Sequence, residues 1–243
     1  MNKKSIFLTV AAIALTAMIA GMTAGCKRTH EQVVEQYPDS TPMLVLELEG
    51  EGDNAVRVGE KRYYANGQLQ YEKHYTAGKN RSSVASGTWR YYHANGKLFA
   101  KADFDAQHPM GDHWSFENEN GEPYFAEGYD SLCVTELNEL ETPATIVLYR
   151  DKNEEHYQFY SNCQIRSHGT TSGGKRIGHW AFWHSNGQMQ AEADFVDGEQ
   201  DGTYCVYREN GVPYYRGTFD HGKRVGRWEF YDEDATLVHT KDY

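Results

Sequence analysis

Residues 174–198 read GKRIGHWAFWHSNGQMQAEADFVDG, and the two segments that follow repeat this pattern without a gap. Residues 198–222 read GEQDGTYCVYRENGVPYYRGTFDHG, and residues 222–243 read GKRVGRWEFYDEDATLVHTKDY. Gly174, Gly198 and Gly222 are therefore spaced 24 residues apart. A fixed period of this length indicates a repeat protein, in which each copy is one small structural unit that stacks on the next.

Each copy has the pattern of two strands joined by a short turn. Asn186-Gly187 is a strong hairpin signal, and we expect a type I′ turn there because both residues tolerate positive φ. After this turn, apolar and polar residues alternate, as in a strand with one buried face. The apolar positions are Met189, Ala191, Ala193 and Phe195.

The strand before each turn carries large aromatic residues that share one face. Aromatic side chains suit a pleated surface and pack against their neighbours on adjacent strands. We therefore expect two aromatic columns to form the core. The first contains Trp89, Trp114, Trp180, Tyr204 and Trp228, and the second contains Tyr91, Phe116, Phe182, Val206 and Phe230.

More divergent copies of the repeat extend upstream. Seven turn centres can be placed, at Gly67, Gly96, Gly121, Cys163, Gly187, Gly211 and Ala235. The pattern predicts an all-β fold, an elongated antiparallel β-meander of repeated hairpins with a period of about 24 residues. We expect an N-terminal linker and capping strand at 27–56, a first block of repeats at 57–130, an irregular insertion at 131–162 and a second block at 163–243.

The repeat form G.W..Y...NG.......F..G resembles the bacterial variant of the MORN repeat, and the resemblance covers most of residues 57–243. It implies arrays of β-hairpins that contact proteins or membranes without a shared catalytic residue. Proteins of this kind are often described as antitoxin components, as immunity-like proteins or as envelope proteins. The resemblance thus implies an antitoxin or immunity-like role.

Residues 1–26 have the pattern of a bacterial lipoprotein signal peptide. Lys3 and Lys4 precede an apolar run from Ile6 to Ile19, and small residues lead to Cys26. Thr23-Ala24-Gly25-Cys26 resembles a lipobox, which implies that Cys26 is lipidated and anchors the chain to the cell envelope. Lys27 favours the outer membrane by the same resemblance. An ordinary cleaved signal with an incidental Cys26 is the alternative.

The net charge and the cysteine content limit the possible partners and disulfides. The formal net charge is −11, which argues against nucleic acid as a partner because phosphates attract basic surfaces. Cys133, Cys163 and Cys205 remain after Cys26, so at most one disulfide can form. A Cys133–Cys163 bond and buried free thiols are both compatible with the sequence.

The sequence contains no recognised catalytic or metal-binding motif. GTTSGGKR at 169–176 approaches a phosphate-binding loop, but Arg176 replaces the required hydroxyl residue and the segment leads into a strand. We interpret it as a repeat boundary, with Lys175 and Arg176 in solvent. The eleven histidines are scattered without ligand spacing. We therefore predict a protein that is not an enzyme and has no cofactor or metal.

The face opposite the aromatic columns offers the best candidate surface. Tyr92, Trp183, Tyr207 and Tyr231 lie three residues before the Asn or Asp of their turns, one residue out of phase with the core. They would form an exposed aromatic ladder or, if that side is covered, a second core. Tyr and Trp anchor protein interfaces and also stack on sugars. We predict binding of a protein partner, with a glycan or peptidoglycan as the alternative ligand.

Overall fold

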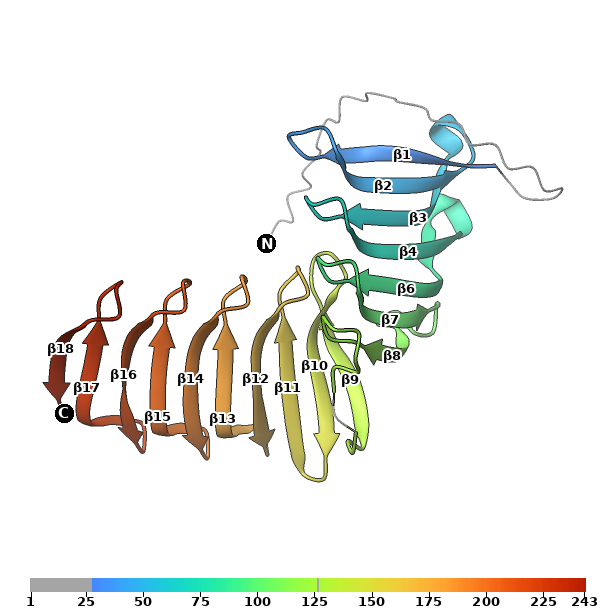
Figure 1. Cartoon of the computed structure of the whole chain (residues 1–243). Coiled ribbons are helices and arrows are strands. Elements are labelled where there is room, and N and C mark those ends of the chain that lie inside the picture. The colour runs from blue at the N-terminus through green and yellow to red at the C-terminus, as the bar shows by residue number, and fades with distance from the viewer. Residues whose placement is uncertain (1–27, 126) are drawn as a thin grey trace, which may run out of the picture. The chain divides into compact units, whose positions relative to one another are not determined.

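A computed structural model describes residues 28–125 and 127–243, so Cys26 and the expected signal peptide lie outside the described residues. The chain forms two compact units that divide between Glu122 and Pro123. Each unit is a sheet of antiparallel hairpins, which confirms the predicted all-β fold (Figure 1). No helix in the described part of the chain is long and apolar enough to cross a bilayer.

Unit 1 contains an eight-stranded sheet and two short 3-10 helices. Its strand order is β1-β2-β3-β4-β6-β7-β8, and β5 pairs with β4. The strands are β1 (Thr29–Gln36), β2 (Pro42–Glu49), β3 (Val56–Tyr63), β4 (Leu69–Ala77), β5 (Ser83–Ala85), β6 (Gly87–Tyr92), β7 (Leu98–Phe104) and β8 (Asp112–Phe116). The helices are η1 (Gly52–Asn54) and η2 (Lys79–Arg81).

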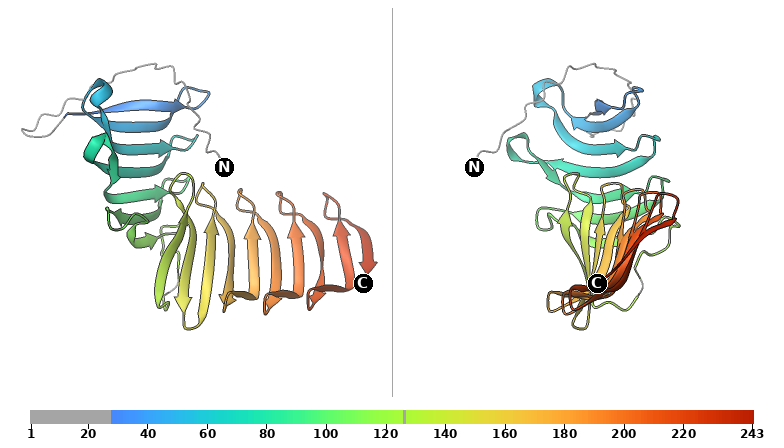
Figure 2. Two further views of the ribbon diagram at one scale, coloured as in Figure 1. Left: turned by 180° about the vertical axis from the view of Figure 1, so that it is seen from behind. Right: turned by 90° about the vertical axis from the view of Figure 1, so that its left-hand side faces the viewer.

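Unit 2 is a ten-stranded meander in which every strand pairs with its neighbours in sequence. Its strands lie side by side in one twisted layer (Figure 2). They are β9 (Ser131–Leu137), β10 (Pro143–Arg150), β11 (Asn153–Phe159), β12 (Ile165–Ser172), β13 (Lys175–Trp183), β14 (Met189–Val196), β15 (Glu199–Tyr207), β16 (Pro213–Asp220), β17 (Lys223–Tyr231) and β18 (Leu237–Asp242).

Two segments are more regular than their sequences suggested. Residues 131–162, expected to be an irregular insertion, contain β9, β10 and β11. Residues 27–56, expected to be a linker with one capping strand, contain both β1 and β2, and β1 is the outer strand. The turn between β1 and β2 has Ser40 where other repeats have glycine, and the turn between β9 and β10 has Glu141 there. Both residues have positive φ, and the absence of glycine hid the repeat pattern.

The turns at one edge of the sheets differ from the expected type I′ geometry. Of Asn186-Gly187, only Gly187 has positive φ (83°). The His184 N–H donates to the Gln188 carbonyl at 2.8 Å, and the Gly187 N–H donates to the His184 carbonyl at 2.9 Å. This is a three-residue loop with a left-handed third residue. All seven predicted turn centres have positive φ: Gly67, Gly96, Gly121, Cys163, Gly187, Gly211 and Ala235.

Two-residue turns join the strands at the opposite edge of unit 2. Ser172 pairs with Lys175, Val196 with Glu199 and Asp220 with Lys223, so each turn contains two residues. Both residues of these three turns have positive φ, as a type I′ turn requires. These turns are Gly173-Gly174, Asp197-Gly198 and His221-Gly222. Gly174 thus turns the chain at a repeat boundary, as predicted.

Aromatic rings fill one face of unit 2 by packing over small residues. Trp180 and Trp228 are 6% and 0% exposed. A Cβ atom at Gly169 would lie 2.1 Å from the Trp180 ring, and one at Gly217 would lie 2.2 Å from the Trp228 ring. These glycines therefore provide the space that the indole rings occupy. Arg176 is exposed, as expected, and its guanidinium also lies 4.4 Å from the centre of the Trp180 ring.

Candidate interaction face

The four predicted surface residues occupy equivalent positions at strand ends. Tyr92, Trp183, Tyr207 and Tyr231 are the last residues of β6, β13, β15 and β17. All four are half-buried, so they form neither a fully exposed ladder nor a closed second core. Tyr92 belongs to unit 1, and the other three belong to unit 2. The latter three are two strands apart, which corresponds to about 9–10 Å.

The backbone at these positions links successive turns. The side chain that opens one turn donates a hydrogen bond to the carbonyl oxygen of the residue before the next turn. Tyr64 donates to Tyr92, Tyr160 to Trp183, His184 to Tyr207 and Arg208 to Tyr231, at 2.8–3.1 Å. The last turn opens with Asp232, a carboxylate that accepts hydrogen bonds from its own turn. The series of links therefore ends at β18.

Turn asparagines add a second set of links. Asn186 accepts a hydrogen bond from the Gln188 N–H and donates one to the Glu209 carbonyl in the next turn, at 3.0 and 2.8 Å. Asn66, Asn95 and Asn162 make the corresponding donations. The role of Asn in the repeat is thus to cap its own turn and to hold the next one, which the hairpin signal alone did not reveal.

A continuous cross-strand row runs along the same face of unit 2. Successive pairings join β11 to β18 through Tyr157, His168, Ala181, Glu192, Cys205, Arg216, Glu229 and Thr240. We call this row, together with Trp183, Tyr207 and Tyr231, the polar-aromatic face. The row depends on register between strands, so alternation within single strands could not predict it.

Carboxylates orient the tyrosines of this face. The Tyr207 hydroxyl donates to Glu192 and the Tyr231 hydroxyl donates to Glu229, both at 2.7 Å. The hydrogen bond to Glu229 raises the pKa of Tyr231. Burial, followed by the hydrogen bond to Glu192, raises the pKa of Tyr207. Both hydroxyls therefore remain protonated donors at neutral pH.

Arg216 and His168 complete these carboxylate groups. Arg216 Nε lies 2.7 Å from Glu229 Oε2, and His168 Nε2 lies 2.9 Å from Glu155 Oε1, which also accepts from Tyr157. Burial alone would raise the pKa of Glu155, but the bonds from Tyr157 and His168 outweigh it and hold this pKa below its ordinary value. The face is therefore patterned with both charges rather than uniformly acidic.

The three described cysteines are free thiols. Cys133 is exposed, Cys163 is buried and Cys205 is half-buried. A Cys133–Cys163 disulfide is therefore not formed. Burial raises the pKa of Cys205, which lies in the polar-aromatic face beside Glu192, and this disfavours its reactive thiolate form.

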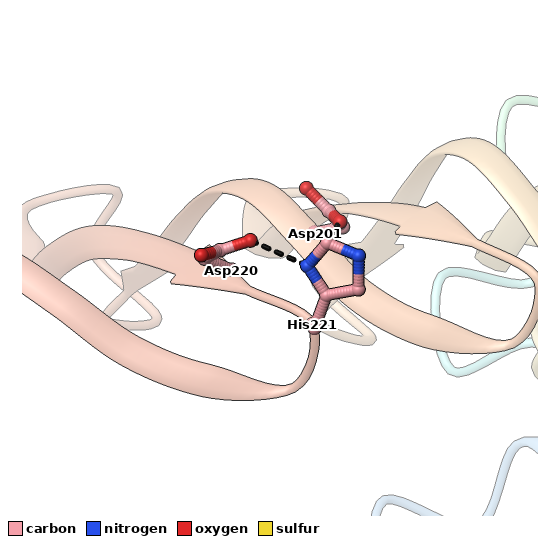
Figure 3. Close-up of side chains that lie close together, drawn as sticks. All are labelled: Asp201, Asp220 and His221. Atoms are coloured by element: carbon pink, nitrogen blue, oxygen red, sulfur yellow. Dashed lines mark hydrogen bonds and ion pairs between the residues drawn. The ribbon is translucent and has the colours of Figure 1, made fainter.

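A separate cluster of ligand-type side chains lies at the edge of unit 2 that carries the two-residue turns. Asp201 in β15, Asp220 at the end of β16 and His221 in the following turn converge there (Figure 3). His221 Nδ1 lies 2.5 Å from Asp220 Oδ1 and 3.7 Å from Asp201 Oδ2. The hydrogen bond to Asp220 raises the pKa of His221.

Comparison with known protein families agrees with the hairpin repeats. The family model described as "MORN repeat variant" matches residues 60–77, 85–106 and 200–221. Each match spans two paired strands and the Asn-Gly turn between them: β3–β4, β6–β7 and β15–β16. No curated protein sequence matches the chain. Segments of both units are therefore similar to the MORN repeat variant.

Proposed function

We propose that this chain is a non-enzymatic protein of the bacterial cell envelope that binds a protein partner through its repeat sheet. A lipid on Cys26 would hold it to the membrane, with the outer membrane as the favoured location. An antitoxin or immunity-like role is one form of this activity, suggested by the family resemblance. The polar-aromatic face of unit 2 is the observation that carries the proposal.

Three properties of this face suit protein recognition. Its Tyr and Trp side chains are the residue types that contribute most to protein interfaces. Tyr207 and Tyr231 are held by carboxylates, so less conformational entropy is lost on binding. The row also alternates basic and acidic groups at His168, Glu192, Arg216 and Glu229, which would fix the register of a partner with complementary charges.

A capture experiment tests the proposed surface. The full chain and the triple variant Trp183→Ala, Tyr207→Ala, Tyr231→Ala would be used as bait in detergent-solubilised envelope. We expect the wild type to recover one specific protein and the triple variant to lose it while its circular dichroism remains native. Val196→Ala, a change at a side chain that is 57% exposed, serves as the matched control and should retain capture. Equal recovery by wild type and triple variant would exclude this face.

Glycan binding by the same rings is the competing function. A sugar would stack on Trp183 or Tyr207 and hydrogen-bond to the neighbouring carboxylates. Binding of purified peptidoglycan or arrayed glycans by the wild type, lost in the triple variant, would replace the protein-partner proposal. Absence of glycan binding combined with specific protein capture would support it.

Lipid anchoring has an independent test. Metabolic labelling with a radioactive fatty acid should mark the wild type and leave Cys26→Ser unlabelled. The Cys26→Ser protein should also be lost from the membrane fraction. A labelled Cys26→Ser variant, or an unlabelled wild type, would contradict the proposed anchor.

A further inference from the structure

The cluster of Asp201, Asp220 and His221 combines ligand types that bind transition metals. One ligand atom from each residue lies within 4.8 Å of the others, and this is the one such group of three among the described residues. The three side chains come from two paired strands and the turn that joins β16 to β17. Figure 3 shows the His221 ring directed toward both carboxylates.

The neighbouring repeats show that the fold does not require these residues. One repeat away, Asp201 corresponds to Ile177 and Val225, which are half-buried apolar residues. Asp220 corresponds to Val196, and His221 to Asp197, in the preceding repeat. The corresponding turns have the same two-residue form without this trio. At this junction, carboxylates occupy two positions that are apolar in a neighbouring repeat, and a histidine stands beside them.

We propose that Asp201, Asp220 and His221 bind a divalent transition-metal ion of the zinc class. Imidazole nitrogen and carboxylate oxygen both ligate Zn²⁺ at about 2.0–2.2 Å. Two ligand atoms at tetrahedral positions around such an ion are about 3.4 Å apart. The 3.7 Å between His221 Nδ1 and Asp201 Oδ2 is close to that value, and the 2.5 Å to Asp220 Oδ1 would widen as the ion replaces the shared proton.

Charge and exposure make the site accessible to an ion from solvent. Glu199 adds a third negative charge to those of the two aspartates, and all three act on His221. The side chains of His221 and Asp220 are 82% and 64% exposed, and that of Asp201 is 30% exposed. Three protein ligands leave at least one coordination position for water. The bound ion would connect β15 to the β16–β17 turn across the sheet edge.

Calorimetric titration of the full chain in detergent with ZnCl₂ tests the site. We expect one Zn²⁺ per chain, with the dissociation constant raised at least tenfold in both His221→Asn and Asp201→Asn. Asn tolerates the positive φ of 46° at position 221, so His221→Asn preserves the turn. Asp201→Asn lies outside the turn and keeps the test independent of turn stability.

His113→Asn is the matched control. His113 also has positive φ and lies 3.6 Å from Asp112 and 4.0 Å from Asp103, but this trio does not converge as the proposed site does. Its removal, and Cys133→Ser, should leave the affinity unchanged. No binding by the wild type would overturn the proposal, and so would an affinity equal to that of the wild type in both His221→Asn and Asp201→Asn. A tenfold loss in His113→Asn or Cys133→Ser would also overturn it by placing the ion elsewhere.

Discussion

In unit 2 the residue beside Trp228 on the neighbouring strand is Gly217, whereas in unit 1 the residue beside Trp89 is Lys73. The two positions are equivalent, because each lies two residues before the aromatic residue that ends its column, Phe219 or Tyr75. In unit 2 the glycine leaves space that the indole ring fills. In unit 1 a long cationic side chain fills the same space itself.

Lys73 in unit 1 places ionisable groups inside an aromatic face. Lys73 is 1% exposed, and its ammonium lies 4.1 Å from the Tyr71 ring centre and 5.1 Å from that of Trp89. Its cross-strand neighbour Glu60 accepts a hydrogen bond from the Tyr71 hydroxyl at 2.5 Å. Burial and this bond raise the pKa of Tyr71, so the hydroxyl stays a donor. The space at this position of the repeat is thus filled in two ways. In unit 2 an aromatic ring packs over a small residue, and in unit 1 a buried cation packs over aromatic rings.

Removing the lysine should produce the largest effect. Lys73→Ala deletes a buried side chain and its cation–π contacts, while Glu60 keeps its ion pair with Arg57. We expect the free energy of unfolding of unit 1 to fall by about 3 kcal/mol. Urea denaturation would measure the loss, and hydrogen exchange should place it in β3, β4 and β6. Lys73→Met, which keeps the length of the side chain, should recover part of the loss. A free energy of unfolding in Lys73→Ala equal to that of the wild type would contradict a stabilising role for Lys73.

Adding one carbon to the glycine of unit 2 should have the next largest effect. The new Cβ of Gly217→Ala would displace the Trp228 ring, and overpacking of this kind costs about 1–3 kcal/mol. Hydrogen exchange should accelerate in β16 and β17 and remain unchanged in unit 1. Thr218→Ala, at the adjacent exposed position, is the control and should change stability by less than about 0.5 kcal/mol. Equal stability of the two variants would show that the ring moves freely.

The turn links should contribute less than either core position. Asn186→Ala loses the cap on its own turn and the donation to Glu209, at a cost of about 1–2 kcal/mol. Asn210→Ala loses only the cap on its own turn, the hydrogen bond from the Val212 N–H, because the structure shows no donation from Asn210 to the next turn within residues 127–243. Thermal unfolding should therefore rank Asn210→Ala between Asn186→Ala and wild type. The reverse order would exclude stabilisation by links between turns.

Acid sensitivity of unit 2 should be the smallest effect. Burial alone would raise the pKa of Asp194, but hydrogen bonds from Thr203 and His179 outweigh it and lower this pKa below 3.8. A lowered pKa stabilises the fold above pH 3.8, and this stabilisation is lost as pH falls through the folded-state value. The contribution should be below about 1 kcal/mol because the carboxylate is 35% exposed. Unfolding of wild type between pH 5 and pH 2.5 should therefore be steeper than that of Asp194→Asn, and equal slopes would contradict this assignment.

Local patterns in the sequence predicted most of the fold, because turns and alternating strands depend on neighbouring residues. The seven predicted turn centres adopt positive φ, and Cys163 and Ala235 do so without being glycine. The turns at Ser40 and Glu141 escaped prediction because their residues carry no such signal. The role of Gly217 and the polar-aromatic face could not be predicted, since both depend on register between strands. That register shifts at bulges, such as the one between Arg216 and Thr218.

The gapless spacing of Gly174, Gly198 and Gly222 has a consequence for how such a chain can change length. Each period contains one full hairpin, so a duplicated copy would enter the sheet with its strand direction and both faces already correct. A duplication that added a single strand would reverse the chain direction and disturb every later pairing. Whole-period duplication or loss can therefore lengthen or shorten the sheet in steps of two strand spacings, about 9–10 Å, without redesign of any neighbouring strand.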